Sequence, residues 1–588
     1  MDKSNQQPSV NRRQFLTLAG AGAVLASLTA MGIPMGLAEN KTEINAENIN
    51  SIIFATDVLV IGSGMAGLFA AVKAHDNGAK VLMVSKGRLG SSGQTPFAKG
   101  IFTFDEKNSK VSLEQFVSMV SRSALNSNNK AYTRQMALNS KECVEELKGW
   151  GFFDSSLCYN SFKKPLADRK IEIKERIMIT HLIKENGKIA GAAGFGLDDE
   201  QVYFFNAKSV ILATGAGGFK PNGFPIRDLT HDGSIMAYNI GARITGKEWN
   251  DGHIARAHNP AACYDGWHGM FEKKPSVTSV EIHHDLGVDI NYLVYIKGAP
   301  VVMGPPGEDN FKILGGPYVP EEFKRRVPPE NDNRPPLRDG KKFGGNPQDR
   351  KGPPGMNGIS VGGASAGMSI HKSEGLVPLN ELCETDIPGL YAAGDALGSH
   401  MSGGIYTQVG SSLAGSAVQG AVAGKEAANY SKKHNLQQIS KSKLLEIKNE
   451  ILAPLKRDSG YSPAWITQTL QGIIIPNFVL YIKKESLLRA ALAYVEELKE
   501  HYLPMIIAKD IHELRLAHET KNMIISAEMK LRASMFRKES RLSHFRLDYP
   551  EIDNKNWQVW INIYKGADGQ MKLEKQPFGF WPDGRKIV

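Results

Sequence analysis

Residues 57–85 read DVLVIGSGMAGLFAAVKAHDNGAKVLMVS, and this stretch decides the fold of the chain. Residues 57–61 form an apolar, branched run that predicts a buried parallel strand. The frame G-x-G-x-x-G follows, before a helix rich in Ala and Leu over residues 65–75 and a second strand over residues 80–85. This order predicts a strand, turn, helix and strand that bind a dinucleotide, with a purely structural glycine turn as the alternative.

Each glycine of the frame has a separate physical role. Gly62 permits the tight turn, Gly64 lets the backbone approach a pyrophosphate, and Gly67 lets the helix pack close to the strand. The first turn of the helix points unpaired N–H groups at the phosphates. The residues predicted to contact the cofactor here are Gly62, Ser63, Gly64, Met65, Ala66 and Gly67.

The second strand ends in Ser85-Lys86, where an NAD site usually has Asp or Glu to hold the ribose. The loop that follows contains Ser92 and Thr95 and leads to Gly100. Its small and hydroxyl-bearing residues can donate hydrogen bonds from the backbone and from side chains, so we expect cofactor contacts there. A plain surface loop is the alternative.

Composition sets the broad class of protein. The 588 residues suffice for two or three domains, and the net charge is +10. No basic stripe interleaves with aromatic residues, so a basic surface is favoured over nucleic-acid binding. That charge suits an anionic substrate or an acidic redox partner. The four cysteines lie far apart and form no C-x-x-C, so no metal site, haem or iron–sulfur cluster is predicted.

The N-terminal segment has the pattern of an export signal. Arg12 and Arg13 precede a mild apolar run to about Met31, and residues 36–38 resemble a cleavage site. We expect residues 1–38 to be a twin-arginine signal that sends the folded protein to the periplasm. An amphipathic start or a membrane anchor is the alternative. No other stretch is long and apolar enough to cross a membrane.

Further elements follow along the chain. Residues 110–150 show the apolar spacing of two helices, and residues 176–194 predict a hairpin that turns at Asn186-Gly187. Residues 207–212 predict another buried strand, which ends in the turn that contains Thr214 and Gly215. His181, on the hairpin, is interpreted as structural.

This order of motifs resembles the flavoprotein subunit of fumarate reductase and succinate dehydrogenase. The segment T-H-D-G at residues 230–233 is similar to that family's T-G-D-G, with His231 in place of a glycine. Residues 388–395 (PGLYAAGD) and 410–415 (GSSLAG) resemble its late strand and the helix near the flavin. The resemblance therefore implies FAD contacts from Thr214, Gly215, Asp232, Asp395, Ser412 and Leu413. The closing stretch, residues 537–557, is also similar to the adenylylsulfate reductase alpha subunit.

The resemblance implies an α/β, Rossmann-like two-dinucleotide-binding-domain FAD fold with an inserted α+β capping domain and a C-terminal helical domain. The expected boundaries are 50–245 and 356–432 for the FAD-binding domain, 246–355 for the capping domain, and 440–588 for the helical domain and tail. In that family the second strand does end in Ser-Lys, as at Ser85-Lys86. Many members then bind FAD covalently through a histidine, but residues 92–95 contain none. Non-covalent FAD is expected.

The resemblance also implies catalytic candidates, with two departures. His253 and His371 stand at the spacing of substrate-binding histidines, although each could instead be structural. The family's carboxylate-binding arginine is missing from residues 402–410. Its proton-donating arginine lies in the capping domain, where Arg325 and Arg326 occur in a different sequence context, and Arg256 is a further candidate.

The leading hypothesis is an exported FAD-dependent oxidoreductase that transfers hydride between flavin N5 and a small, anionic, unsaturated substrate. No second nucleotide-binding unit occurs, so electrons would come from a partner: an iron–sulfur protein, a cytochrome or a quinol-linked protein. The helical domain would receive this partner or serve only as a scaffold. The alternatives are a flavoprotein subunit that acts on a sulfur compound, as in adenylylsulfate reductase, and a non-catalytic flavin electron-transfer subunit.

Overall fold

The computed structural model describes residues 49–97, 100–107, 111–155, 157–221, 226–250, 254–259, 262–265, 274–276, 359–362, 369, 371–404 and 410–588. Residues 1–38 and most of the expected capping domain lie outside these described residues. The expected domain boundaries next to the capping segment therefore stay predictions.

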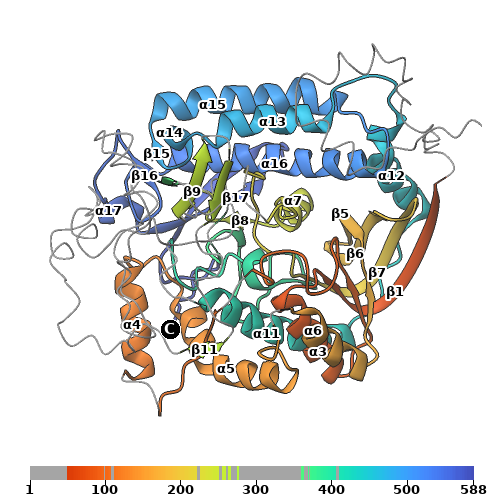
Figure 1. Ribbon diagram of the computed structural model, residues 1–588, viewed down its shortest axis with the longest axis horizontal. Helices are drawn as coiled ribbons and strands as arrows, with labels where there is room; N and C mark the ends of the chain where they lie inside the picture. The colour runs from red at the N-terminus through yellow and green to blue at the C-terminus, as the bar shows by residue number, and fades with distance from the viewer. Residues whose placement is uncertain are drawn as a thin grey trace, which may run out of the picture. The chain divides into compact units, whose positions relative to one another are not determined.

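A twisted sheet of seven described strands forms the core of the FAD-binding region (Figure 1). Its order is β4-β2-β1-β7-β6-β5, and β14 pairs with the end of β7. Strands β1, β2, β4, β7 and β14 are parallel, whereas β5 and β6 form the expected antiparallel hairpin. The strand bounds are β1 Asn50–Ile61, β2 Val81–Val84, β4 Glu172–Lys174, β5 Ile177–Glu185, β6 Lys188–Gly196, β7 Gln201–Leu212 and β14 Leu390–Ala392.

Two helices pack closely beside the first strand. Helix α3 (Met65–Asp76) is the expected crossover helix, and α11 (Ser411–Lys433) packs against it. A Cβ at Gly420 would lie 2.2 Å from the carbonyl oxygen of Ala66, and one at Gly424 would lie 2.3 Å from that of Ala70. Only glycine permits such an approach of two backbones, so these residues set the distance between α3 and α11. The same region contains α4 (Leu113–Ser123), α5 (Lys130–Gly149) and α6 (Tyr159–Asp168).

The end of the chain returns to the FAD-binding region through a second sheet. Its order is β13-β8-β17-β18, so β17 pairs directly with β8, more than 300 residues earlier in the sequence. The bounds are β8 Ile244–Thr245, β13 Gly375–Leu376, β17 Val559–Lys565 and β18 Met571–Pro577. Helix α7 (Asp232–Asn239) precedes β8, and the short α17 (Asn554–Trp557) precedes β17.

Only short strands of the expected capping domain are described. They include β9 (Ile254–Asn259) and β10 (Ala262–Asp265), which pair antiparallel with each other, and β9 also pairs with β12 (Ile359–Gly362), just beyond the expected boundary at residue 355, in the order β10-β9-β12. In addition, β11 (Lys274–Ser276) pairs with β3 (Gly100–Phe102), which belongs to the FAD-binding region.

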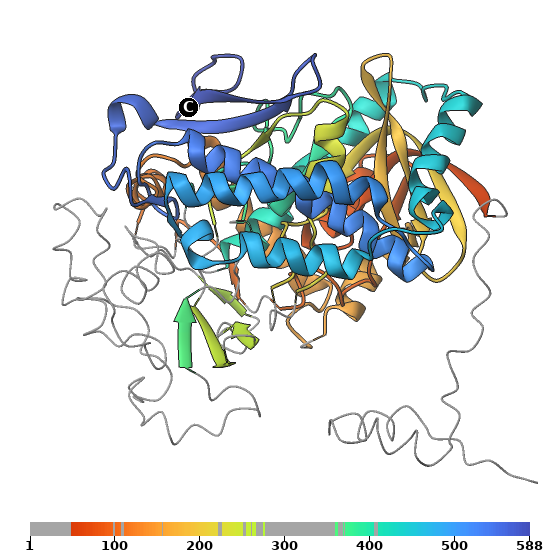
Figure 2. The same ribbon diagram turned by 90° about the horizontal axis from the view of Figure 1, so that it is seen from above.

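The expected helical region is present after residue 440. Helices α13 (Pro463–Ile474), α15 (Glu485–Glu497) and α16 (Ile511–Phe536) run side by side in both views (Figures 1 and 2). Ile466, Leu488 and Ile524 form part of their shared core. Around them lie α12 (Lys441–Leu452), α14 (Asn477–Leu480), β15 (Ile482–Lys483) and β16 (Phe545–Arg546), with short 3₁₀ or π turns at Ala453–Lys456, Leu498–Tyr502 and Leu503–Met505. A further 3₁₀ turn, Gly394–Ala396, follows β14 in the FAD-binding region. No described helix is both long and apolar enough to cross a membrane.

Candidate functional site

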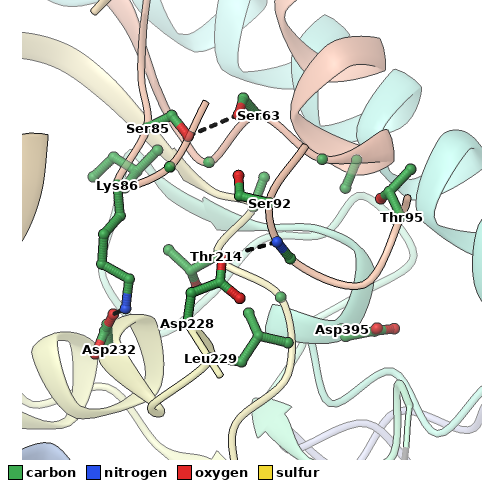
Figure 3. Close-up of a pocket in the computed structure, with 18 of the residues that line it drawn as sticks. Ser63, Ser85, Lys86, Ser92, Thr95, Thr214, Asp228, Leu229, Asp232 and Asp395 are labelled. Atoms are coloured by element: carbon green, nitrogen blue, oxygen red, sulfur yellow. Dashed lines mark hydrogen bonds and ion pairs between the residues drawn. The ribbon is translucent and has the colours of Figure 1, made fainter. Parts of the chain in front are cut away.

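A pocket lies at the carboxyl ends of β1, β2 and β7, where the predicted dinucleotide turn stands (Figure 3). Most of the predicted cofactor residues line it. They are Gly62, Ser63, Gly64, Met65, Ala66, Ser85, Lys86, Ser92, Thr95, Thr214, Gly215, Asp232 and Asp395. The sequence motifs therefore converge on one cavity, although they are spread over more than 330 positions.

The turn after β1 explains the spacing of its glycines. Gly62 has φ +112°, and a Cβ there would lie 2.2 Å from the carbonyl oxygen of Ala213. A Cβ at Gly67 would lie 1.9 Å from the carbonyl oxygen of Gly62, so this glycine sets the packing of helix and turn. At Gly64 the nearest atom is Thr95 Oγ1, at 3.2 Å. A Cβ added at Gly62 or Gly67 would therefore point into the protein backbone, whereas one at Gly64 would point toward the pocket.

Helix α3 begins at this turn and offers its first N–H groups to the pocket. The N-cap residue, Gly64, has no side chain to cap the helix, and the backbone N–H of Met65 donates to Thr95 Oγ1 at 3.1 Å. Such a helix start favours an anionic ligand, because its N–H groups and its dipole both present positive charge. Ser85, at the end of β2, shares a hydrogen bond of 2.7 Å with Ser63, which joins the two strand ends.

Lys86 lies in an ion-pair cluster along one wall of the pocket. Its Nζ atom is 2.6 Å from Asp232 Oδ2 and 3.1 Å from Glu519 Oε1 (Figure 3 shows the first pair). Burial alone would lower the pKa of Lys86, but the carboxylates of Asp232 and Glu519 outweigh it and raise that pKa above its ordinary value. Lys86 is therefore a fixed positive charge.

A second cluster surrounds Asp395. Lys372 Nζ lies 2.6 Å from Asp395 Oδ1 and also donates to the carbonyl oxygen of Ser412 at 2.8 Å. His371 Nδ1 lies 3.3 Å from Asp395 Oδ2 and 3.4 Å from Gln94 Nε2. Burial would raise the pKa of Asp395, but Lys372 and His371 hold it below its ordinary value. Asp395 is therefore ionised and can orient the imidazole of His371.

Buried polar atoms near α11 support a bound flavin nucleotide. Gly410, with φ +82°, precedes the helix, and no side chain caps its start. Ser411 Oγ, Ser412 Oγ and Gln94 Oε1 are buried and have no hydrogen-bond partner among the described residues. Buried hydroxyl and amide groups are normally satisfied, so these atoms are suited to hydrogen bonds with a polar ligand. Together with the starts of α3 and α11, whose N-cap residues are glycines, they fit FAD.

Not every predicted contact lines the pocket. Gly67 packs against the turn, and Leu413 is buried in the core. Ser412 reaches the Asp395 cluster through its carbonyl group, and the backbone of Gly100 pairs with Lys274 in the β3–β11 ladder.

Of the predicted catalytic residues, His371 lies beside the pocket. His253, Arg325 and Arg326 fall outside the described residues. The backbone of Arg256 lies in β9, where it is paired with Tyr264 and Ser360, and its side chain is outside the description. These four roles stay predictions.

The structure explains why His231 can stand where the resembled family has a glycine. It precedes α7 with φ +62°, a backbone conformation that glycine adopts most easily. Its ring is buried, with Nδ1 3.3 Å from Glu374 Oε1 and 3.5 Å from Lys247 Nζ. Burial and then the charge of Lys247 lower the pKa of His231 to about 4, so its imidazole is neutral at pH 7.

Sequence reasoning missed several pocket residues. Asp228 accepts a hydrogen bond from the backbone N–H of Gly93 at 2.8 Å and thereby holds the loop after β2. Its position two residues before the T-H-D-G segment was the available signal. Outside the lining, Glu519 and Asn522 on α16 contact Lys86 and Asp232, and no local pattern distinguishes them from other helix residues. The remaining missed lining residues include Gln94, Ile177, Ile179, Leu229, Met236 and Ser416.

Two family models match the chain, in agreement with this site. A model of the FAD binding domain matches residues 57–163, and a model of the fumarate reductase flavoprotein C-terminal region matches residues 468–582. An uncharacterized FAD-dependent oxidoreductase of Methanocaldococcus jannaschii is 25% identical over 563 residues, covering 88% of this chain and 98% of the relative.

Two further relatives are similar over nearly their whole length. One is a subunit of the CoM/CoB fumarate reductase of Methanothermobacter marburgensis, which is 23% identical, with 89% of this chain and 99% of the relative covered. L-aspartate oxidase of Yersinia pestis is also 23% identical, with 85% and 97% covered.

Solved structures show the same fold. E. coli quinol fumarate reductase matches with a TM-score of 0.68 at 17% identity, covering 89% of this chain and 97% of the other. Adenylylsulfate reductase of Archaeoglobus fulgidus matches with the same TM-score of 0.68 at 21% identity, covering 91% and 98%.

The site and these matches define the chain as an FAD-dependent oxidoreductase. Within that class it is similar to fumarate reductase and L-aspartate oxidase. FAD is therefore the cofactor, and the resemblance inferred from the sequence motifs is confirmed.

Proposed function

We propose that this protein reduces the activated C=C bond of a small anionic compound. The proposal rests on one observation: the C-terminal region contacts residues of the FAD-binding region that line one pocket. The C-terminal region that matches the fumarate reductase flavoprotein model contributes α16, which contacts Lys86 and Asp232 in the FAD-binding region. The chain is also similar to the Methanothermobacter marburgensis fumarate reductase subunit over 99% of that subunit's length, which supports reduction of a C=C bond.

The described residues have distinct tasks in this reaction. The turn at Gly62–Gly67 and the start of α11 bind and orient FAD, which when bound supplies the hydride through flavin N5. His371, oriented by Asp395, holds a substrate carboxylate or polarises a carbonyl group. His253 is proposed as a second carboxylate contact, and Arg256, Arg325 and Arg326 are the candidates for the proton donor.

A second function, action on a sulfur compound, is supported by the equal fold similarity to adenylylsulfate reductase. Its sequence signal, residues 537–557, is weaker evidence for a substrate. Arg537 is buried between Glu248 and Glu539, at 3.0 and 2.7 Å, and Arg541 also binds Glu539, at 2.8 Å. Since these arginines are engaged in internal ion pairs, the shared motif supports a shared packing arrangement. A flavin electron-transfer subunit without its own substrate is the third candidate.

Anaerobic reoxidation of the flavin tests these functions. We would reduce the FAD of the purified protein chemically and record its spectrum after separate additions of fumarate, other enoates, sulfur compounds, or a redox protein. We expect an enoate to restore the oxidised spectrum at a catalytic rate, with a loss of at least roughly 100-fold in His371→Asn. His181→Asn is the matched control, because His181 pairs with Glu450 away from the pocket. Reoxidation by a sulfur compound alone, or by a redox protein alone, would support the second or third function instead.

Export and an electron-transfer partner complete the proposal. We propose that residues 1–38 direct the protein to the periplasm by the twin-arginine pathway, on the evidence of Arg12, Arg13 and the apolar run after them. Replacement of both arginines by lysine should leave the protein in the cytoplasm in cell fractionation. We also propose that a separate iron–sulfur protein, cytochrome or quinol-linked protein supplies the electrons.

A further inference from the structure

We propose that helix α16 of the C-terminal region holds the FAD pocket in its binding conformation, with Glu519 and Asn522 as positioning residues for Lys86 and Asp232. This inference depends on FAD as the cofactor and not on the identity of the substrate.

Two side chains of α16 contact two pocket-lining residues from different elements. Glu519 Oε1 accepts from Lys86 Nζ at 3.1 Å, and Asn522 Nδ2 donates to Asp232 Oδ1 at 2.9 Å. Glu519 and Asn522 are three residues apart, so they share one face of the helix. Lys86 follows β2 and Asp232 begins α7, and these two bind each other at 2.6 Å. One helix face therefore fixes both components of the pocket wall.

The Glu519 end of the contact is buried, which makes it costly to break. The Glu519 side chain has no exposed surface, and it also accepts hydrogen bonds from Lys220 and Arg515. Loss of its charge would leave Lys86 and Lys220 with one carboxylate fewer in a region shielded from water. Lys86 would keep Asp232 at 2.6 Å but lose its second carboxylate, and the excess of buried positive charge beside Lys220 is unfavourable, so the Lys86 side chain would take a different position.

Because Lys86 and Asp232 line the pocket, FAD binding and the attachment of α16 must influence each other. A helix that stabilises the binding conformation raises the affinity for FAD. By thermodynamic linkage, bound FAD then stabilises the attachment of the helix by the same factor. This coupling connects the FAD-binding region with a segment more than 400 residues later.

The test compares Glu519→Gln with Glu528→Gln. Glu528 is a matched control: it is buried on the same helix and pairs with Lys499 and Arg532, each at 2.8 Å, and neither partner lines the pocket. We expect Glu519→Gln to weaken FAD binding about tenfold, measured as flavin fluorescence released on dilution of the holoprotein. Removal of FAD should also speed amide hydrogen exchange in residues 511–523 of the wild type, and this difference should vanish in Glu519→Gln.

Three results would overturn the inference. They are unchanged FAD release in Glu519→Gln, equally faster release in Glu528→Gln, and hydrogen exchange in α16 that does not respond to FAD in the wild type. If Glu519→Gln does not fold, Asn522→Ala takes its place, because it removes one hydrogen bond to the Asp232 carboxylate and leaves the ion pairs intact. We expect it to weaken FAD binding about threefold, and an unchanged release rate would contradict the proposal.

Discussion

Gly67 and Gly64 show how one motif combines two different requirements. A Cβ at Gly67 would collide with backbone at 1.9 Å, whereas one at Gly64 would meet only a threonine hydroxyl, at 3.2 Å. Backbone cannot move away without displacing α3 from the sheet, but a side chain can rotate. Gly67 therefore controls the stability of the fold, and Gly64 controls access of the ligand to the backbone.

We therefore expect Gly67→Ala to lower the free energy of unfolding by roughly 2–4 kcal/mol and to reduce the FAD content of the purified protein. Urea denaturation and the flavin-to-protein absorbance ratio measure the two effects. Gly149→Ala, at the end of α5, is the control, because no atom lies within 4 Å of the added Cβ. An equal loss in both variants would show that the close contact at Gly67 is not the cause.

At the scale of single residues, the sequence predicted positions whose identity is set by local backbone geometry. Gly62, Gly64 and Ser85 follow from the turn after a strand, and Asp395 follows from the strand-end motif of the resembled family. Asp228 could not be predicted in the same way, since its role depends on a hydrogen bond to Gly93, 135 residues earlier. Burial of charged groups such as Lys372 likewise becomes visible only after folding.

Helix α16 illustrates what periodicity predicts for an element and what it misses. Apolar spacing predicts a helix over residues 519–536, whereas the helix begins at Ile511. Its start is fixed by Asp510, whose side chain accepts a hydrogen bond from the backbone N–H of Glu513 at 2.8 Å. The apolar pattern is weak in the first two turns because Leu514 and Ala517 are their only buried apolar residues.

The same helix gives a pH dependence of stability. Burial lowers the pKa of His518 from 6.5 to about 3, while its Nε2 atom bonds to the carbonyl oxygen of Ile451 at 2.9 Å. The unfolded chain therefore binds a proton that the folded chain does not in the range between these values, and stability falls as the pH drops below 6.5. The cost is roughly 1.4 kcal/mol per pH unit for this histidine. We expect His518→Gln to reduce the proton uptake on unfolding by about one at pH 5, as measured by urea denaturation at several pH values. An unchanged pH slope in His518→Gln would contradict this assignment.

At the scale of the whole molecule, the last strands of the chain contact segments that are distant in sequence. Trp560, in β17, donates from Nε1 to the carbonyl oxygen of Ser127 at 2.7 Å. Its ring also stacks on His400, with centroids 4.9 Å apart. One side chain thus connects the loop before α5, the strand-end region after β14, and the C-terminal sheet. Neither the pairing of β17 with β8 nor this contact could be predicted, because neither leaves a periodic signal in the sequence.

This connection predicts graded effects of two substitutions. Trp560→Phe retains an aromatic ring against His400 but leaves the Ser127 carbonyl without its donor, so we expect a loss of roughly 1–2 kcal/mol. Trp560→Ala also leaves a cavity between the three segments, and a loss of roughly 3–5 kcal/mol is expected. Urea denaturation, followed at once by flavin fluorescence and by circular dichroism, would measure both. If the segments act as one cooperative unit, the two signals change together in each variant. Release of FAD at a lower urea concentration than the loss of helix would show instead that the C-terminal sheet stabilises the FAD-binding region without unfolding together with it.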